Sequence, residues 1–195
     1  MKFYYVNIME GYALAYYDLQ ESINYECEKC GAIYLSKRVG KYRTHFEGKK
    51  LGDFYRAPGC YIGNKKFIDM LEKYKITGYK IGELDCTGWY DRRKNIIEVD
   101  TSTLREIEIT GKCGYMCDVS GNEIEKCDKC GQIDFYVRKR INGLSVPLDT
   151  WDGSDIFSFE NWKKVMVCSE RLKEACEKEN IKNISFLPIE EFTFV

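Results

Sequence analysis

The chain has 195 residues, the length of one domain or two small ones. Hydrophobic residues make up 44% and charged residues 31%, a balance that is typical of a globular protein rather than a disordered or membrane-embedded one. Its 30 basic and 31 acidic side chains leave a net charge of −1. This excludes the basic excess that broad, non-specific nucleic-acid binding normally needs.

No run of apolar residues approaches the roughly 18 that a membrane-spanning helix needs, so we expect no membrane partner. The first ten residues, MKFYYVNIME, do not form a secretory signal, because Asn7 and Glu10 interrupt the apolar run. We therefore expect a cytoplasmic protein. In that reducing compartment the ten cysteines are expected to be metal ligands, core residues or reactive thiols rather than disulfides.

The predicted elements are mostly strands, indicated by β-branched and aromatic residues. In chain order they cover residues 2–8, 32–35, 42–46, 79–81, 95–99, 104–109, 131–137, 165–167 and 184–187. Pro58-Gly59 predicts a turn. Two helices are predicted after N-cap residues: Asn64 precedes one that ends before Gly78, and Ser169 precedes the other. Because strands outnumber helices, we expect an α+β fold of mainly antiparallel sheets with two helices packed on them.

The two halves of the sequence resemble each other. Residues 27–33 parallel residues 127–133 at an offset of 100, and residues 64–81 parallel residues 169–186 at an offset of 105. We interpret this as two pseudo-repeated lobes, about 1–100 and 101–195, within a single domain that covers residues 1–195. Two copies are too few for a solenoid.

The motif Cys-x-x-Cys-Gly occurs in both halves. Four thiolates suit the tetrahedral coordination of zinc, and two intervening residues let one tight turn supply two ligands. Glycine after each second cysteine tolerates a positive φ, which lets backbone amides turn toward the sulfurs. The sequence therefore predicts a structural zinc ion that joins the two halves, without an open coordination position for chemistry. The predicted ligands are Cys27, Cys30, Cys127 and Cys130.

Three other interpretations of the cysteines stay open. Cys113 and Cys117 form C-x3-C-x9-C-x2-C with the second motif, which can hold zinc locally and leave the first motif apart. The motifs can instead be redox dithiols, although each is followed by a β-prone run rather than a helix. The cysteines can also be free core thiols, which is the default for Cys168 and Cys176.

No motif identifies an enzyme. The sequence contains no phosphate-binding glycine loop, nucleophile elbow or His-Glu-x-x-His pattern. Its single histidine, His45, has no specific partner among ten cysteines, so we expect no catalytic site. Basic runs at residues 37–43 and 136–140 keep nucleic-acid binding open as an alternative, although the neutral overall charge favours a solvated face. Their arginines are Arg38, Arg43, Arg138 and Arg140.

Residues 148–162 combine four acids with two tryptophans and two phenylalanines, and contain no Lys or Arg. Aromatic side chains supply contact area at low entropic cost, and acids steer a surface toward a basic partner. The isoleucine and phenylalanines of this segment are expected in the core. The candidate partner-binding residues are Trp151, Asp152, Asp155 and Glu160.

Three features occur together: two Cys-x-x-Cys-Gly motifs about a hundred residues apart, the turn at Pro58-Gly59 between them, and Asp155-Ile156-Phe157 followed by a strand and a Ser169-capped helix. In this combination the chain resembles the double-CXXCG motif proteins, a bacterial family that includes immunity proteins of polymorphic toxin systems. The Cys113/Cys117 pair and the Lys- and Tyr-rich background depart from that family's pattern.

The resemblance implies a cytosolic immunity protein, not an enzyme, that binds and neutralises a cognate protein toxin. On that interpretation zinc stiffens the scaffold, and an acidic, aromatic surface occludes the toxin. If the toxin is a nuclease, neutralisation is expected to depend on Asp152 and Glu160. A zinc-ribbon nucleic-acid binder and a thiol-disulfide oxidoreductase are the alternatives from other functional classes.

Overall fold

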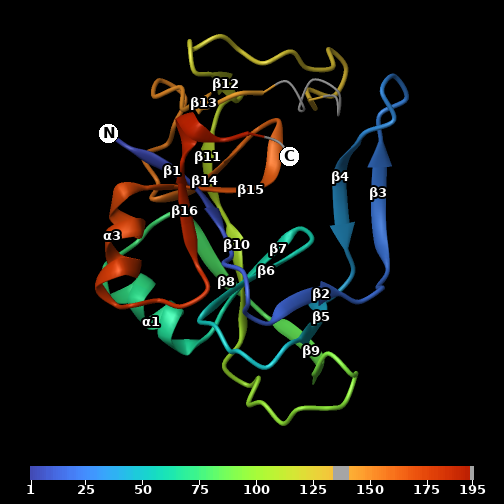
Figure 1. Ribbon diagram of the computed structural model, residues 1–195. Helices are drawn as coiled ribbons and strands as arrows, with labels where there is room; N and C mark the ends of the chain where they lie inside the picture. The colour runs from blue at the N-terminus through green and yellow to red at the C-terminus, as the bar shows by residue number, and fades with distance from the viewer. Residues whose placement is uncertain (134–140, 194–195) are drawn as a thin grey trace.

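A computed structural model describes residues 1–133 and 141–193 of the chain (Figure 1). The turn at Pro58-Gly59 joins β6 (Phe54–Ala57) and β7 (Cys60–Gly63) into an antiparallel hairpin, as the sequence predicts. Next comes α1 (Lys65–Lys73), where the side chain of Asn64 accepts a hydrogen bond from the backbone N–H of Phe67 at 3.1 Å. After α1 the chain continues into β8 (Tyr79–Gly82).

A second unit repeats this arrangement. A hairpin of β14 (Ile156–Phe159) and β15 (Trp162–Ser169) leads into α3 (Glu170–Lys178) and then β16 (Ser185–Pro188). Both helices have nine residues, and their buried side chains fall at equivalent positions 105 residues apart. They are Phe67, Met70 and Leu71 in α1, and Leu172, Ala175 and Cys176 in α3. The repeat that the sequence predicts is thus present in the backbone.

Each unit takes one strand from the other half of the chain. β10 (Arg105–Ile109) lies between β7 and β8, so the first sheet has the order β6-β7-β10-β8. β1 (Phe3–Asn7) lies between β15 and β16 in the second, whose order is β11-β14-β15-β1-β16. The second sheet also gains β11 (Gly111–Cys113), parallel to β14. The two halves have therefore exchanged their first strands.

The two units share one hydrophobic core. It contains the inner faces of α1 and α3 together with Val6 of β1, Ile107 of β10 and Ile156 of β14. Figure 1 shows the two helices next to each other on one side of the molecule. Because both sheets and both helices contribute to this core, neither half of the chain buries its apolar residues alone.

The remaining strands form smaller sheets. β2 (Leu14–Tyr17), β5 (Tyr42–Glu47) and β9 (Leu84–Tyr90) form one in the order β2-β5-β9, in which β5 and β9 run parallel. β3 (Ser22–Glu26) and β4 (Ile33–Arg38) form a hairpin, which stands at the right of Figure 1. β12 (Cys117–Asp118) pairs with β13 (Leu144–Ser145), and a short 3-10 helix covers Ile189–Glu191.

Over residues 1–133 and 141–193 these elements confirm the predicted fold class: a mainly β protein with several sheets, mostly antiparallel, and two helices. The predicted strand at 95–99 is wrong. After β9 the chain turns back, and Ile96 forms only an isolated bridge with Tyr90, the last residue of β9. The predicted strand at 131–137 is not found over residues 131–133, and its remainder lies outside the described residues. Ser169 occupies the N-cap of α3 but makes no side-chain cap, because its hydroxyl donates to Asp155.

In the part of the chain that the structure describes, none of the helices has the length and apolar character needed to cross a lipid bilayer.

Candidate metal centre

The first Cys-x-x-Cys-Gly motif forms the tight loop between β3 and β4, which we call the first knuckle (residues 27–31). The backbone N–H of Gly31 donates to the carbonyl of Cys27 at 2.7 Å, and the N–H of Cys27 donates to the carbonyl of Ala32 at 2.9 Å. Gly31 has a φ of +69°, a conformation that favours glycine and lets the chain reverse here. Both cysteine side chains therefore leave one compact turn.

The second knuckle (residues 127–131) repeats these contacts. The N–H of Gly131 donates to the carbonyl of Cys127 at 2.8 Å, and the N–H of Cys127 donates to the carbonyl of Gln132 at 2.9 Å. Gly131 has a φ of +71°. The two knuckles are thus matched in sequence and in backbone geometry.

The fold brings the two knuckles together. The Sγ atoms of Cys27, Cys30, Cys127 and Cys130 all lie within 4.8 Å of one another. The Sγ–Sγ distance is 3.9 Å between Cys27 and Cys127 and 3.6 Å between Cys30 and Cys130. Four sulfurs at about 2.3 Å from a tetrahedral ion lie roughly 3.8 Å from one another. A disulfide would need about 2.05 Å, so the spacing fits a shared metal ion and not a bonded pair.

Ion pairs cross between the knuckles in both directions. Lys29 of the first donates to the carboxylate of Asp128 in the second at 2.7 Å, and Lys129 of the second pairs with Glu28 of the first. Asp128 and nearby Cys127 raise the pKa of Lys29, with Asp128 the larger cause. The two lysines thus join the knuckles and place positive charge beside the four sulfurs, where it offsets the negative charge of metal-bound thiolates.

In each knuckle the first thiol is prepared to ionise, whereas the pKa of the second, Cys30 or Cys130, is raised, at Cys130 to about 12 by burial. The backbone N–H of Cys30 lowers the pKa of Cys27 to about 7, and the N–H of Cys130 lowers the pKa of Cys127. Thiolate, rather than thiol, is the form that binds metal. Cys27 is buried and Cys30 is exposed, so the cluster lies at the protein surface with one side covered.

Cys113 and Cys117 lie outside this four-cysteine cluster. Both are buried, and their thiols donate to the carbonyls of Pro147 and Tyr115 at 3.7 and 3.6 Å. Burial raises the pKa of Cys113 to about 11. The structure therefore brings together the predicted ligand set that spans the two halves, and not the local alternative.

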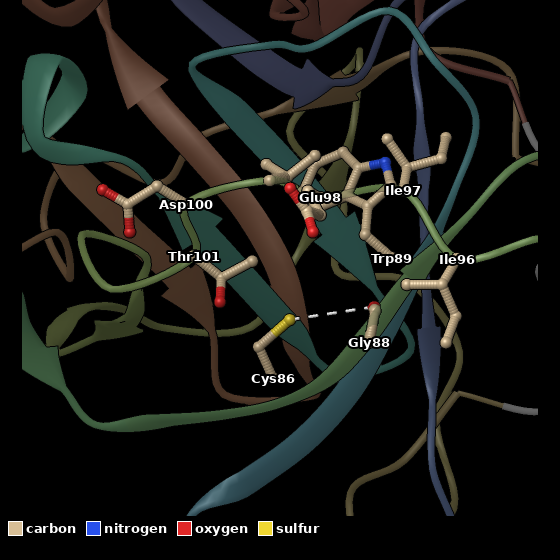
Figure 2. Close-up of a pocket in the computed structure, with 9 residues that line it drawn as sticks. Cys86, Gly88, Trp89, Ile96, Ile97, Glu98, Asp100 and Thr101 are labelled. Carbon is tan, nitrogen blue, oxygen red and sulfur yellow. Dashed lines mark hydrogen bonds between the residues drawn. The ribbon is translucent and has the colours of Figure 1, made fainter.

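The other four cysteines occupy apolar surroundings. Burial raises the pKa values of Cys60 and Cys168, and it raises that of Cys176 to about 12. Cys86 lies in the wall of a surface pocket of about 460 Å³ beside Trp89, where its thiol donates to the carbonyl of Gly88 at 3.8 Å (Figure 2). Burial raises its pKa as well. None of these four thiols has the lowered pKa of a reactive cysteine.

The predicted partner-binding residues differ in their placement. Asp155 is only 3% exposed, and it accepts hydrogen bonds from Thr77, Ser169 and Arg171. Its carboxylate joins α3 to the segment after α1, so Asp155 is not part of an accessible surface. Two of the four proposed residues, Asp152 and Glu160, are exposed.

Trp151 and Asp152 have structural contacts of their own. The half-buried ring of Trp151 packs edge-on against Phe3, with ring centroids 5.1 Å apart. Asp152 is exposed, but its carboxylate accepts hydrogen bonds from the backbone N–H groups of Lys112 at 2.8 Å and Ser154 at 3.0 Å. Both residues hold the loop before β14 in place.

Both arginines of the basic run at 37–43 pair with acids of the protein. Arg38 pairs with the buried carboxylate of Glu106, and Arg43 lies 3.0 Å from Asp85. The second run, which contains Arg138 and Arg140, lies outside the described residues. His45, the single histidine, contacts the carboxylates of Asp18 at 2.6 Å and Glu47 at 3.4 Å.

Sequence reasoning missed Glu28 and Asp128 as partners in the cluster. The available signal was the matched order Cys, acid, Lys, Cys, Gly in both motifs, which allows reciprocal pairing when the motifs face each other. A scan against models of known protein families finds no match for this chain, and a search of curated proteins finds none either.

Proposed function

We propose that this chain is a zinc-stabilised immunity protein that binds and neutralises a protein toxin. The observation that carries the metal part is the convergence of four cysteine Sγ atoms within 4.8 Å from knuckles a hundred residues apart. The toxin-binding part rests on the resemblance to the double-CXXCG motif proteins.

Zinc is the metal that fits the donor set best. Tetrahedral sites made of four sulfurs select zinc or iron, and four-cysteine knuckles of this spacing are typical of structural zinc. Since all four positions are taken by protein ligands, the ion contributes stability and no chemistry. A rigid scaffold suits a toxin-binding role, because ordering an interface during binding costs affinity.

Metal analysis of the purified protein tests the zinc proposal. We expect one zinc ion per chain, and loss of that ion in Cys27→Ser and in Cys130→Ser. The matched control is Cys86→Ser, which removes a half-buried thiol away from the cluster and is expected to keep its zinc. Freshly purified protein without stoichiometric zinc, or with iron in its place, contradicts the assignment.

Co-expression tests the immunity proposal. The candidate toxin is the product of the reading frame immediately upstream of this gene, and we expect this protein to restore growth of cells that express it. Glu160→Lys is expected to weaken rescue if the acidic surface contacts the toxin, whereas Glu174→Lys on the exposed face of α3 serves as the charge-matched control. Failure of the unaltered protein to bind or neutralise that product rules out this pairing.

One observation keeps a thiol-disulfide oxidoreductase as the second candidate. The pKa of Cys27, lowered to about 7, is also the property of an attacking thiol. Rapid alkylation of Cys27 in the zinc-loaded protein, together with disulfide reductase activity, supports that candidate. Protection of Cys27 by zinc excludes it.

A further inference from the structure

A groove of about 870 Å³ contains no residue of the knuckles, and its lining combines four basic and two aromatic side chains with three acidic ones, Glu10, Glu47 and Asp91. Three turns form its walls, at residues 9–12 before β2, 47–50 after β5 and 91–95 after β9. Its volume falls within the range of roughly 300–1,000 Å³ that is usual for small-molecule sites. The positive and aromatic side chains that line it are Tyr12, Tyr16, Lys49, Lys50, Arg92 and Arg93.

Backbone hydrogen bonds connect the three turns. The N–H of Ala13 donates to the carbonyl of Lys50 at 2.9 Å, and the N–H of Gly48 donates to the carbonyl of Tyr90 at 2.8 Å. Trp89 adds a bond from its ring nitrogen to the carbonyl of Gly48 at 2.7 Å. The walls are therefore formed before any ligand arrives, which lowers the entropic cost of binding.

The turn at 91–95 presents two neighbouring arginines. The carboxylate of Asp91 accepts hydrogen bonds from the backbone N–H groups of Arg93 at 2.8 Å and Asn95 at 3.0 Å, which fixes the turn. The bonds from Asn95 lower the pKa of Asp91, so its carboxylate stays ionised. The carboxylate of Asp91 thus accepts hydrogen bonds from the backbone of the turn. Arg92 and Arg93 are both exposed to solvent.

The acids of the lining compensate the positive charge of the groove only in part, with four basic side chains against three acidic ones. Over residues 1–133 and 141–193, the side chains of Lys49, Arg92 and Arg93 form no ion pair with a carboxylate. Glu47, an acid of the groove wall, is already paired with Lys94. In a chain whose net charge is −1, unpaired cations gathered around one hollow create a local positive field that attracts anions.

The two tyrosines give the groove flat apolar surfaces beside the cations. Tyr16 is 39% exposed, and its ring stacks on His45 with ring centroids 5.3 Å apart and planes inclined by 13°. Tyr12 carries the ammonium of Lys50 at 3.7 Å from its ring centroid. Aromatic rings held in this way can stack on nucleobases. Each guanidinium group can donate two parallel hydrogen bonds to the oxygens of a phosphate.

We infer that this groove binds a nucleotide, with its phosphate groups at Arg92, Arg93 and Lys49 and its base beside Tyr12 and Tyr16. An acidic peptide offers matching charge but no ring for the tyrosines, so the combination of side chains favours the nucleotide. The inference is independent of the zinc site and of toxin binding, since it uses neither the knuckles nor the segment before β14.

Calorimetric titration of the full-length protein tests this inference. The probes are the four ribonucleoside diphosphates, inorganic pyrophosphate, adenosine and hexaglutamate. We expect at least one diphosphate to bind with one-to-one stoichiometry and more tightly than pyrophosphate or adenosine. Arg92→Gln/Arg93→Gln is expected to weaken its binding about tenfold or more, because charge-assisted contacts to phosphate are lost.

Two further variants separate charge from stacking. Tyr16→Leu is expected to weaken nucleoside diphosphate binding while leaving pyrophosphate binding unchanged. Lys2→Gln/Lys178→Gln removes the same charge from exposed positions remote from the groove and is expected to have no effect. Thermal melting of each variant confirms that it folds.

Three results would overturn the inference. The first is no saturable binding of any nucleoside diphosphate below about 1 mM. The second is binding of pyrophosphate or hexaglutamate that is as tight as that of every nucleotide. The third is equal weakening by the groove variant and by its remote control.

Discussion

Lys75 and Asn180 have the same left-handed backbone conformation, with φ of 49° at both, and lie 105 residues apart. Each directly follows the C-cap residue of its helix, Tyr74 of α1 and Glu179 of α3. The N–H of Lys75 donates to the carbonyl of Glu72, and that of the next residue, Ile76, donates to Leu71. Asn180 and Ile181 make the same pair of bonds to Glu177 and Cys176. Both helices therefore end in a Schellman motif.

Lys75→Gly is expected to stabilise the protein by about 1 kcal/mol, because glycine adopts a positive φ without the steric cost that lysine bears. Asn180→Gly is expected to gain less, since asparagine tolerates this conformation better. Chemical denaturation measures both. The control is Glu72→Gly in the last turn of α1, which should destabilise by about 1 kcal/mol. A loss of stability in Lys75→Gly contradicts the assigned helix end.

Removal of the metal is expected to lower the thermal unfolding midpoint by roughly 10 °C, because the ion closes a long loop between the knuckles. Differential scanning calorimetry of the zinc-loaded and chelator-treated protein measures this change. Adding zinc back should restore the midpoint, and Cys130→Ser should show no response to either treatment. Equal unfolding midpoints with and without metal would show that the ion does not contribute to the stability of the fold.

The ion pairs between the knuckles are expected to raise zinc affinity, because they hold together the two turns that carry the cysteine ligands. Lys29→Glu replaces the ion pair with Asp128 by two facing carboxylates that repel each other. This change is expected to lower zinc affinity by roughly tenfold. The double variant Lys29→Glu/Asp128→Lys restores an opposite-charge pair and should recover most of that affinity. Competition with a chromogenic chelator measures it. If the double variant binds no better than the single one, the pairing has no such role.

Cutting the chain near residue 100 is expected to leave the two halves associated. A protease site inserted between Asp100 and Thr101 lies in the loop between β9 and β10, outside both sheets. Because β1 and β10 each belong to the sheet of the other half, the cleaved protein should keep its elution volume in size-exclusion chromatography, even after chelation. Separation of the fragments in native buffer would contradict the strand exchange.

Asp155→Ala is expected to destabilise the protein by about 3 kcal/mol, because it removes the hydrogen bonds and the ion pair that the buried carboxylate makes with Thr77, Ser169 and Arg171. Glu160→Ala, which changes the exposed acid of the same segment, is expected to have little effect on stability. Urea denaturation compares the two. Equal stability of the two variants would contradict the structural role of Asp155 and would leave it a candidate for partner contact.

The sequence predicts well the features that depend on local spacing. The repeated Cys-x-x-Cys-Gly identifies the four clustered cysteines, because two residues between cysteines define one tight turn wherever it occurs. Asn64 and Ser169 mark the helix starts, since N-cap positions follow short-range rules. The division into lobes at about residue 100 stays a prediction, and two of the sheets, β6-β7-β10-β8 and β11-β14-β15-β1-β16, each contain a strand from beyond that division.

Features that depend on distant pairing could not be predicted. The position of β1 between β15 and β16 needs contacts across more than 150 residues, as in the pairing of Tyr4 with Cys168 and Pro188. The burial of Asp155 depends on Thr77, which no local pattern connects to it. Residues 95–99 have the apolar content of a strand, yet they form only a bridge before the chain follows the wall of the pocket beside Cys86.

The exchanged strands also determine when this protein can fold during synthesis. β1 is synthesised long before both of its neighbours, β15 and β16, which belong to the second half of the sequence. Until those two strands have been synthesised, the nascent N-terminal half therefore exposes an unpaired, apolar strand, which is a state prone to aggregation. Such a chain should benefit from chaperone binding on the ribosome, and it can complete its four-cysteine cluster only once the second knuckle has been synthesised.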